Sequence, residues 1–289
     1  MKRIVTCVVG AGLCICGAGV VLGQSPGPSK MLKIYREEIK PGRNAAHERV
    51  EAAYARAFSK DNYPYYIGLQ SLTGPSEAWF LERYDNYAGM ERALKLADME
   101  PLKSSLDSLD AQDGELRSGG RILICTYHEE LSYVPVPPDL AAVRYISVNT
   151  VRTRPGRAPE FQEMRKLLNA AFEKSGSKQR RAVYAVNSGA PMGTYLILSG
   201  MNSLEQMDQT PAVSMPDAFG SENLERYRKL FSELVLSSEN TMFAVNPKMS
   251  HPPKEYITAA PDFWAPKPAK AAVSAPAPAK GSAARTAGQ

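Results

Sequence analysis

The stretch Lys40-Pro41-Gly42-Arg43 occurs a second time, almost unchanged, as Arg154-Pro155-Gly156-Arg157. The two copies lie 114 residues apart, since 154 − 40 = 114. Each follows a segment in which apolar and polar side chains alternate, which is the period of a β-strand. Proline and glycine end such a strand in a turn, and a long amphipathic segment then begins. The two tetrapeptides therefore mark the same point in two similar halves of the chain.

Other landmarks repeat in the same order, at an offset that grows slowly along the chain. They are Ala57-Phe58 with Ala171-Phe172 at 114, Pro75 and Trp79 with Pro191 and Tyr195 at 116, and Leu131-Ser132 with Met249-Ser250 at 118. An ordered series of this kind is typical of a tandem duplication with small insertions.

Each half predicts the same order of elements: a strand, a helix, two strands, a helical region and a last strand. The ranges are 32–36, 45–60, 65–72, 78–84, 87–109 and 122–129 in the first half, and 146–150, 159–174, 182–187, 194–198, 221–236 and 241–245 in the second. This βαββαβ order is the ferredoxin-like module. One such sheet has a bare face, and two sheets facing each other bury both.

We therefore predict an α+β fold with two tandem ferredoxin-like modules, residues 31–133 and 144–251, packed as an intramolecular α+β barrel. A short proline-rich linker, 134–143, joins them. In the helix at 45–60 the apolar stripe is read as Val50, Tyr54, Ala57 and Phe58. On that reading His47, in the first turn, points into solvent.

The series of strand, Lys-Pro-Gly-Arg turn, long helix and strand pair resembles the dimeric α+β barrel superfamily, in particular NIPSNAP-type proteins and antibiotic-biosynthesis-monooxygenase-like domains. The resemblance covers about 31–131 and 144–250. It implies a pocket between each sheet and its facing helices, or inside the barrel. The superfamily includes cofactor-free monooxygenases, haem-binding relatives, isomerases and ligand binders, so it implies no single activity. The expected oligomeric state is a monomer or a homodimer, because a duplicated chain supplies both halves of a barrel.

The amino terminus predicts export. Residues 1–23 combine Lys2 and Arg3 with an uncharged apolar run, and a small residue precedes Gln24. This is the pattern of a secretory signal peptide, followed by a spacer at 24–30. An uncleaved membrane anchor is the alternative, since about 20 apolar residues just span a bilayer. The expected location is periplasmic or extracellular.

The other end, 252–289, is rich in proline, alanine and lysine and predicts a disordered tail. Phe263 and Trp264 stand out within it as large apolar residues. Two interpretations are open for them: they dock on the adjacent domain, or they form a short motif for a partner.

The net charge of +5 belongs to the two ends. Residues 1–23 contribute +2 and residues 265–289 contribute +4, so the part between carries 5 − 2 − 4 = −1. A nearly neutral body disfavours nucleic-acid binding. Any binding to acidic surfaces should therefore vanish when residues 265–289 are deleted.

Cysteine and histidine patterns point to no metal or nucleophile motif. Cys7, Cys14 and Cys16 lie in the leader, and Cys125 lies in an apolar run, where it is expected as a small buried hydrophobe. No HxH, HExxH or paired-carboxylate motif supports a metal centre. No metal or cofactor is therefore predicted, with haem as a minor possibility.

His128 is the histidine singled out, because it is in phase with Ile124 and Thr126 on an expected strand. It could be a haem ligand, a general base, or a hydrogen-bonded edge residue. Aromatic side chains also crowd the strand pair of the first half: Tyr63, Tyr65, Tyr66, Trp79, Phe80 and Tyr84. They form cross-strand core contacts or line an apolar pocket. The candidate pocket residues are Glu37, Tyr66, Trp79, Arg83 and His128.

From these observations we predict an exported protein that binds a small apolar or aromatic ligand or has an interaction role in the envelope. The alternative is an enzyme, either a cofactor-independent monooxygenase-like or a haem-dependent one, centred on His128. The uneven distribution of aromatic residues places a single pocket in the first half and makes the second half a structural copy.

Overall fold

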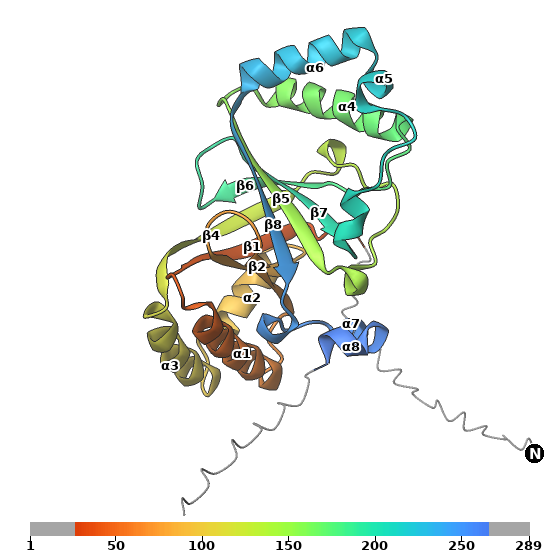
Figure 1. Ribbon diagram of the computed structural model, residues 1–289. Coiled ribbons are helices and arrows are strands. Elements are labelled where there is room, and N and C mark those ends of the chain that lie inside the picture. Colours follow the sequence, from red (N-terminus) through yellow and green to blue (C-terminus); the bar gives the residue numbers. More distant parts are fainter. Residues whose placement is uncertain (1–26, 266–289) are drawn as a thin grey trace, which may run out of the picture.

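A computed structural model describes residues 27–265, and within it eight strands close into one barrel (Figure 1). The order around the barrel is β1-β3-β2-β8-β5-β7-β6-β4, with every neighbouring pair antiparallel. The strands are β1 (Met31–Ile39), β2 (Tyr66–Ser71), β3 (Glu77–Tyr84), β4 (Arg117–Tyr127), β5 (Tyr145–Thr153), β6 (Ala182–Ser188), β7 (Thr194–Met201) and β8 (Val235–Val245). The predicted signal peptide, 1–23, and the segment 266–289 lie outside the described residues.

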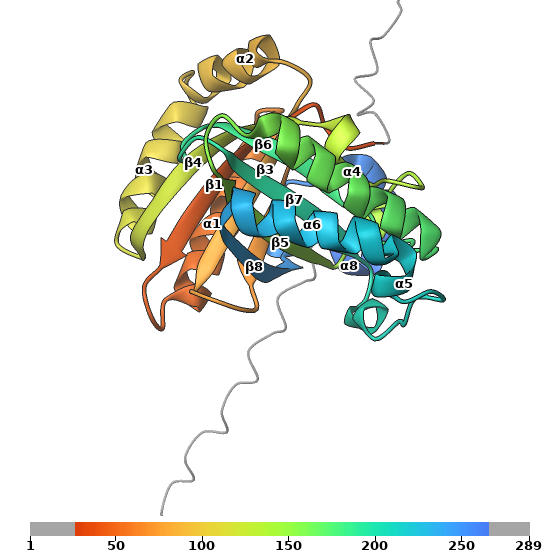
Figure 2. The ribbon, with the colours of Figure 1, turned by 90° about the horizontal axis from the view of Figure 1, so that it is seen from above.

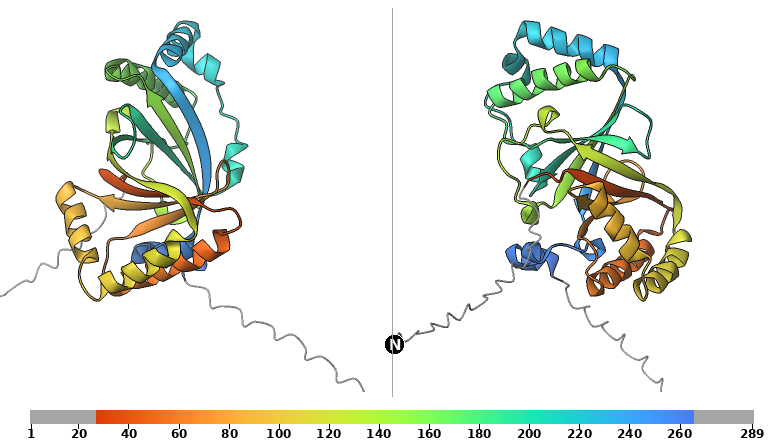
Figure 3. Two further views of the ribbon diagram at one scale, coloured as in Figure 1. Left: turned by 90° about the vertical axis from the view of Figure 1, so that its left-hand side faces the viewer. Right: turned by 180° about the vertical axis from the view of Figure 1, so that it is seen from behind.

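Two groups of helices cover opposite sides of the barrel (Figures 1 and 3). The first group is α1 (Asn44–Lys60), α2 (Tyr87–Ala97) and α3 (Leu102–Gly114); the second is α4 (Ala158–Lys174), α5 (Met215–Phe219) and α6 (Ser221–Leu234). Seen from above, α4 and α6 run side by side across the barrel (Figure 2). None of the helices in residues 27–265 combines the length and apolarity needed to cross a membrane.

The two halves have the same topology. The first half contributes β4-β1-β3-β2 and the second β8-β5-β7-β6, joined through β2–β8 and β4–β6. β1 starts at Met31 and β5 at Tyr145, an offset of 114, while β4 starts at Arg117 and β8 at Val235, an offset of 118. These are the offsets of the sequence landmarks. The fold is α+β with a closed antiparallel barrel.

The structure differs from the predicted elements in the second helical region of the first half and at the start of the last strand of each half. The helical region at 87–109 is two helices, because Pro101 cannot continue a helix and α3 starts only after it. The last strands begin at Arg117 and Val235 rather than at 122 and 241. β4 begins with the polar and glycine residues 117–121, whereas β8 begins with Val235 and Leu236, which the sequence pattern assigns to the preceding helix, followed by the polar residues 237–240. Pairing with β1 and β5 places these residues in the sheet.

Strand periodicity divides the first-half sheet into two faces. On β1, Leu32 and Ile34 point into the barrel, where they join its apolar core. Lys33, Tyr35 and Glu37 alternate with them and face the layer of α1–α3. The barrel interior is thus mainly apolar, with the Arg36–Glu77 ion pair within it, whereas the face under the helices carries several charges.

The predicted disordered tail is wrong for residues 252–265. This segment forms α7 (Lys254–Ala259) and α8 (Pro261–Trp264) at one end of the barrel. Trp264 is 3% exposed, and its indole Nε1 donates a hydrogen bond to the Ala141 carbonyl over 2.9 Å. The Arg144 guanidinium stacks on the Phe263 ring at 3.9 Å. Docking of Phe263 and Trp264 on the adjacent domain is therefore confirmed, and their burial outweighs the chain entropy that composition alone suggested.

The turn between β6 and β7 requires glycine at position 189. Gly189 has a φ of +91°, and a Cβ there would lie 1.9 Å from the Ile122 carbonyl oxygen. We expect Gly189→Ala to lower the free energy of unfolding by at least about 2 kcal/mol, measured by urea denaturation. Gly176→Ala is the control, because Gly176 has a φ of +69° but open space around its Cβ. Gly176→Ala should lower the free energy of unfolding by only about 1 kcal/mol. Equal losses in the two variants would show that the backbone shifts to relieve the clash at position 189.

Candidate functional site

The structure distributes the five predicted pocket residues over separate places. Glu37 and Tyr66 line a cavity between the first-half sheet and α1–α3. Trp79 lies inside the barrel and is 2% exposed, with its Nε1 donating to Glu77 Oε2 over 2.8 Å. Arg83 lines a second, apolar cavity of about 150 Å³ at the barrel end near Trp264, and donates to the Gly27 carbonyl.

His128 lies at neither cavity. It follows the last residue of β4 and is half-buried, with its Nδ1 2.9 Å from Glu130 Oε1. Among the described residues, His128 therefore shares no cavity with the other predicted pocket residues.

The cavity under α1–α3, hereafter the sheet–helix cavity, encloses about 210 Å³. Its walls are mainly aromatic rings and its polar positions are mainly carboxyl groups. The lining residues are Tyr35, Glu37, Glu51, Tyr54, Phe58, Tyr63, Tyr66, Phe80, Glu82, Ala97, Leu106, Asp110 and Arg117. Residues from β1, β2, β3, α1, α2, α3 and the start of β4 thus meet around one space.

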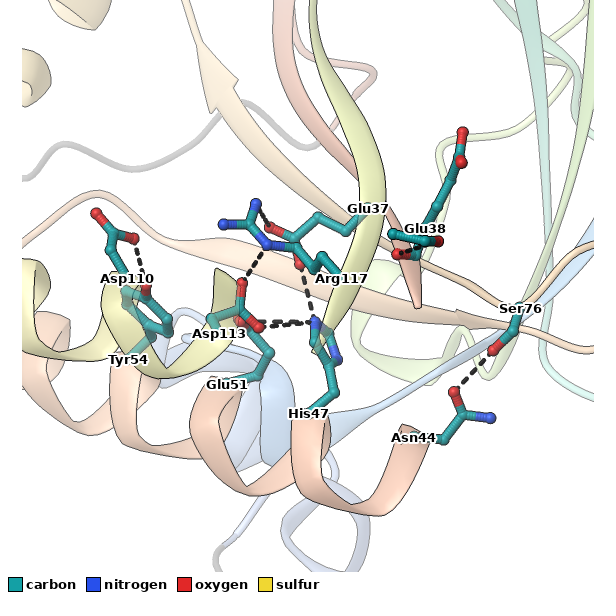
Figure 4. Close-up of polar contacts among 11 residues, drawn as sticks. Glu37, Glu38, Asn44, His47, Glu51, Tyr54, Ser76, Asp110, Asp113 and Arg117 are labelled. Atoms are coloured by element: carbon teal, nitrogen blue, oxygen red, sulfur yellow. Dashed lines mark hydrogen bonds and ion pairs between the residues drawn. The ribbon is translucent and has the colours of Figure 1, made fainter. Parts of the chain in front are cut away.

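Four titratable side chains gather with Arg117 at one end of this cavity (Figure 4). Glu37 comes from the helix-facing phase of β1, His47 and Glu51 lie one turn apart on α1, and Asp113 is in the last turn of α3. His47 Nε2 is 2.9 Å from Glu37 Oε2, 3.5 Å from Asp113 Oδ1 and 3.8 Å from Glu51 Oε1. We call Glu37, His47, Glu51 and Asp113 the buried cluster.

The prediction for His47 is wrong. It is 2% exposed, because the buried face of α1 runs through His47, Glu51 and Ala55 rather than through Val50 and Ala57. Apolar residues define a helix stripe in a sequence, and here two polar side chains occupy the inner face. The spacing of His47 and Glu51 by four residues, on one helix face, was the signal available for it.

Burial raises the pKa values of two carboxyl groups in the cluster. Removal from water, together with the negative charges of Glu37 and Asp113, raises the pKa of Glu51 well above its usual value. Burial and the charge of Glu37 raise the pKa of Asp113 to about 6, against an opposing effect of Arg117. The cluster is therefore a place where a proton or a cation relieves repulsion between carboxylates.

Most other polar groups of the cavity pair with one another, whereas the Tyr66 hydroxyl has no hydrogen-bond partner among the described residues. Lys33 Nζ lies 3.5 Å from Glu82 Oε2, and the hydroxyls of Tyr63 and Tyr84 donate to the Glu82 carboxylate over 3.2 and 2.7 Å. The Tyr54 hydroxyl donates to Asp110. Unlike the buried cluster, Glu82 thus has a cation and two donors of its own.

The second half has no counterpart of the buried cluster. At the offset of 114, Glu37, His47 and Glu51 correspond to Val151, Phe161 and Arg165. Val151 and Phe161 belong to the apolar core under α4 and α6. Arg165 is buried and donates to the Leu131 carbonyl over 3.1 Å.

Comparisons with known proteins find no matching family model and no matching curated protein. Solved structures with a similar chain course include an anthrone oxidase-like protein, with 12% identity, a TM-score of 0.49 and coverage of 76% of this chain and 93% of the other. A variant of the chlorite dismutase from Candidatus Nitrospira defluvii has 10% identity, a TM-score of 0.47 and coverage of 80% and 95%. A candidate monooxygenase from Lactobacillus acidophilus NCFM has 8% identity, a TM-score of 0.46 and coverage of 75% and 94%.

Proposed function

We propose that the protein binds a small aromatic or apolar molecule in the sheet–helix cavity. The observation that carries this proposal is the cavity's composition: aromatic walls with a few converging polar groups are typical of ligand sites. Phe58 packs against Tyr63 with ring centroids 4.1 Å apart, and Tyr66 packs edge-on to Phe80 at 6.1 Å, so the walls hold one another in place.

The charges of the cavity favour a neutral ligand over an anion. Glu37, Glu51, Glu82 and Asp110 line it, and Arg117 is the cation among its lining residues. A bound carboxylate would stand among like charges at low dielectric, which is costly. A phenolic ring suits the site better, because its hydroxyl can donate to a carboxyl oxygen and its ring can stack on the walls.

Isothermal titration calorimetry with 4-methylphenol tests the proposal, and 4-hydroxybenzoate is the anionic comparison. We expect 4-methylphenol to bind the wild-type chain and Ala182→Leu, which fills the barrel-end cavity instead. Ala97→Leu, which fills the sheet–helix cavity, should weaken binding at least about tenfold. Equal binding of the anion, or loss of binding in Ala182→Leu but not in Ala97→Leu, would contradict the proposal.

An enzyme is the second candidate function, and Glu51 rather than His128 is the residue that supports it. Glu51 lines the cavity and has a raised pKa, which is the property of a general acid or base at neutral pH. Conversion of a phenol in air, followed by liquid chromatography, tests this candidate. Turnover that is lost in Glu51→Gln, with 4-methylphenol still bound, would support an enzyme; binding without turnover leaves a binding protein.

We further propose that the two halves arose by tandem duplication of a ferredoxin-like unit, that the protein is exported, and that it is monomeric. The matched order of elements supports the duplication, and closure of the barrel within one chain supports the monomer. Size-exclusion chromatography with light scattering distinguishes a monomer from a homodimer.

Thiol counting tests the export proposal. Cys125 is fully buried, and burial raises the pKa of its thiol to about 12. We expect no reaction of Cys125 with Ellman's reagent in the native protein. After unfolding in guanidinium, a chain recovered from the periplasm should show one thiol. Four thiols would show that the leader with its three cysteines is retained.

A further inference from the structure

We propose that the buried cluster of Glu37, His47, Glu51 and Asp113 is a binding site for one divalent first-row transition-metal ion. One side-chain donor atom from each residue lies within 4.8 Å of the others, and all four residues are buried. Donors about 2.1 Å from a common ion stand about 3 Å apart in adjacent positions and about 4.2 Å apart across it. The distances from His47 Nε2 to the three carboxylates, 2.9 to 3.8 Å, fall in this range.

Arg117 orients two of the carboxylates for such an ion. Its Nη1 lies 3.1 Å from Glu37 Oε1, and its Nε lies 2.6 Å from Asp113 Oδ2. The other oxygens, Glu37 Oε2 and Asp113 Oδ1, are the ones that face His47 Nε2. Each carboxylate therefore uses one oxygen for the guanidinium and presents the other to the shared point. Outer partners of this kind commonly fix the ligands of protein metal sites.

Unpartnered polar atoms point independently to a missing ligand. Within residues 27–265, three buried side-chain polar atoms make no hydrogen bond, namely Tyr66 Oη, Asp113 Oδ1 and Arg117 Nε. Arg117 Nε still has an ion-pair partner, Asp113 Oδ2 at 2.6 Å, which leaves Tyr66 Oη and Asp113 Oδ1 as the two atoms to explain. Asp113 and Arg117 belong to this end of the cavity, and Tyr66 lines it with an exposed fraction of only 4%. Buried polar atoms normally have partners, so their concentration at one place requires an explanation. A bound ion takes Asp113 Oδ1 directly, and a water on that ion would accept or donate a hydrogen bond at Tyr66.

The charge balance supports a cation. Three buried carboxylates face one guanidinium, and His47 is neutral when Nε2 acts as a ligand. A divalent ion makes the group of five side chains neutral overall, since −3 + 1 + 2 = 0. Three oxygen donors and one imidazole suit Mn²⁺, Fe²⁺, Co²⁺ or Zn²⁺, whereas Ca²⁺ and Mg²⁺ prefer oxygen donors alone. Hydrogen bonding with a protonated His47 is the competing explanation, in which the cluster is only structural.

The second half shows what this position holds when no ion is needed. Val151 and Phe161 replace Glu37 and His47, and the space is filled by apolar packing. The same backbone is thus built there without carboxyl groups, and Arg165, in the place of Glu51, donates to the Leu131 carbonyl. The polar group in the first half is therefore not a requirement of the fold.

Titration of the chelator-treated chain with Mn²⁺ and Co²⁺ tests the site, without any organic ligand. We expect one ion per chain by elemental analysis, with visible Co²⁺ absorption that reports nitrogen and oxygen ligands. Glu51→Gln and Asp113→Asn should each weaken binding at least about tenfold. Glu77→Gln is the matched control, because Glu77 is equally buried but pairs with Arg36 inside the barrel; its affinity should equal that of the wild type.

Circular dichroism of each variant shows whether it has folded, and His47→Gln provides a second variant at a different ligand. Failure of the wild-type chain to bind either ion, or equal affinity in the folded Glu51→Gln, Asp113→Asn and His47→Gln variants, would overturn the metal site. The proposed function is tested separately, since 4-methylphenol binding is measured on the chelated protein. A chain that binds the phenol but no ion refutes this inference alone.

Discussion

Replacing Arg117 with methionine should lower the free energy of unfolding by on the order of 3 kcal/mol in metal-free buffer at neutral pH. Arg117 contacts Glu37 and Asp113, whose side chains are 10% and 2% exposed. Methionine keeps most of the apolar stem but removes the charge, which leaves the buried carboxylates of Glu37 and Asp113 without their cation. Removal of one partner of a buried pair costs more than the pair itself contributes, because the remaining charge is unsatisfied. Chemical denaturation followed by circular dichroism measures the loss.

Arg226→Met is the matched control for this prediction. Arg226 makes two hydrogen bonds to Glu163, of 2.8 and 3.0 Å, but both side chains are more than 40% exposed. An exposed pair contributes about 0–1 kcal/mol, so this variant should unfold almost like the wild type. The double variant Arg117→Met, Asp113→Asn should regain part of the stability lost in Arg117→Met, because it removes one unpaired charge. If Arg117→Met lowered the free energy of unfolding as little as Arg226→Met does, water would have to reach the buried cluster.

The fold was predictable because its signals are local and repeated. Strand periodicity, the two Pro-Gly turns and the amphipathic helices recur in order at offsets of 114 to 118 residues, and the observed elements keep these offsets. The polar residues 117–121 of β4 and 237–240 of β8 could not be assigned to strands, since only pairing with β1 and β5 places them in the sheet. Tertiary pairing overrides propensity at such places.

The site was less predictable, because its residues are far apart in sequence and only the four-residue spacing of His47 and Glu51 links any of them. Glu37, His47 and Asp113 meet only after β1, α1 and α3 have packed together. One part of the error was avoidable, however. Trp79 and Phe80 are consecutive on β3, so they had to point to opposite faces of the sheet, and they could not line one pocket. Applying the same rule separates Arg83 from Glu82 and leaves Glu37 and Tyr66 as the candidates under the helices.

Trp264→Ala should lower the free energy of unfolding by about 3–5 kcal/mol, the usual cost of truncating a buried large aromatic residue. The indole belongs to the apolar core of the barrel, packs on Tyr256 with ring centroids 5.7 Å apart, and donates to the Ala141 carbonyl. Alanine would enlarge the barrel-end cavity of about 150 Å³ and remove one of the two donors to that carbonyl, since Arg144 Nη1 also donates to it over 2.8 Å. Thermal and urea denaturation of the two proteins measure the difference.

Two truncated chains test whether the docked helices α7 and α8, rather than the residues after them, stabilise the protein. A chain ending at Ala265 keeps every contact of α7 and α8, so it should unfold like the full-length protein. A chain ending at Pro253 lacks both helices and should lose at least as much stability as Trp264→Ala. Phe263→Ala should cost less than Trp264→Ala, because the Phe263 ring lies at the surface against Arg144 and is only partly buried. If the chain ending at Pro253 were as stable as the one ending at Ala265, the docking of Trp264 would contribute nothing, and residues 252–265 would behave as the tail that their composition suggests.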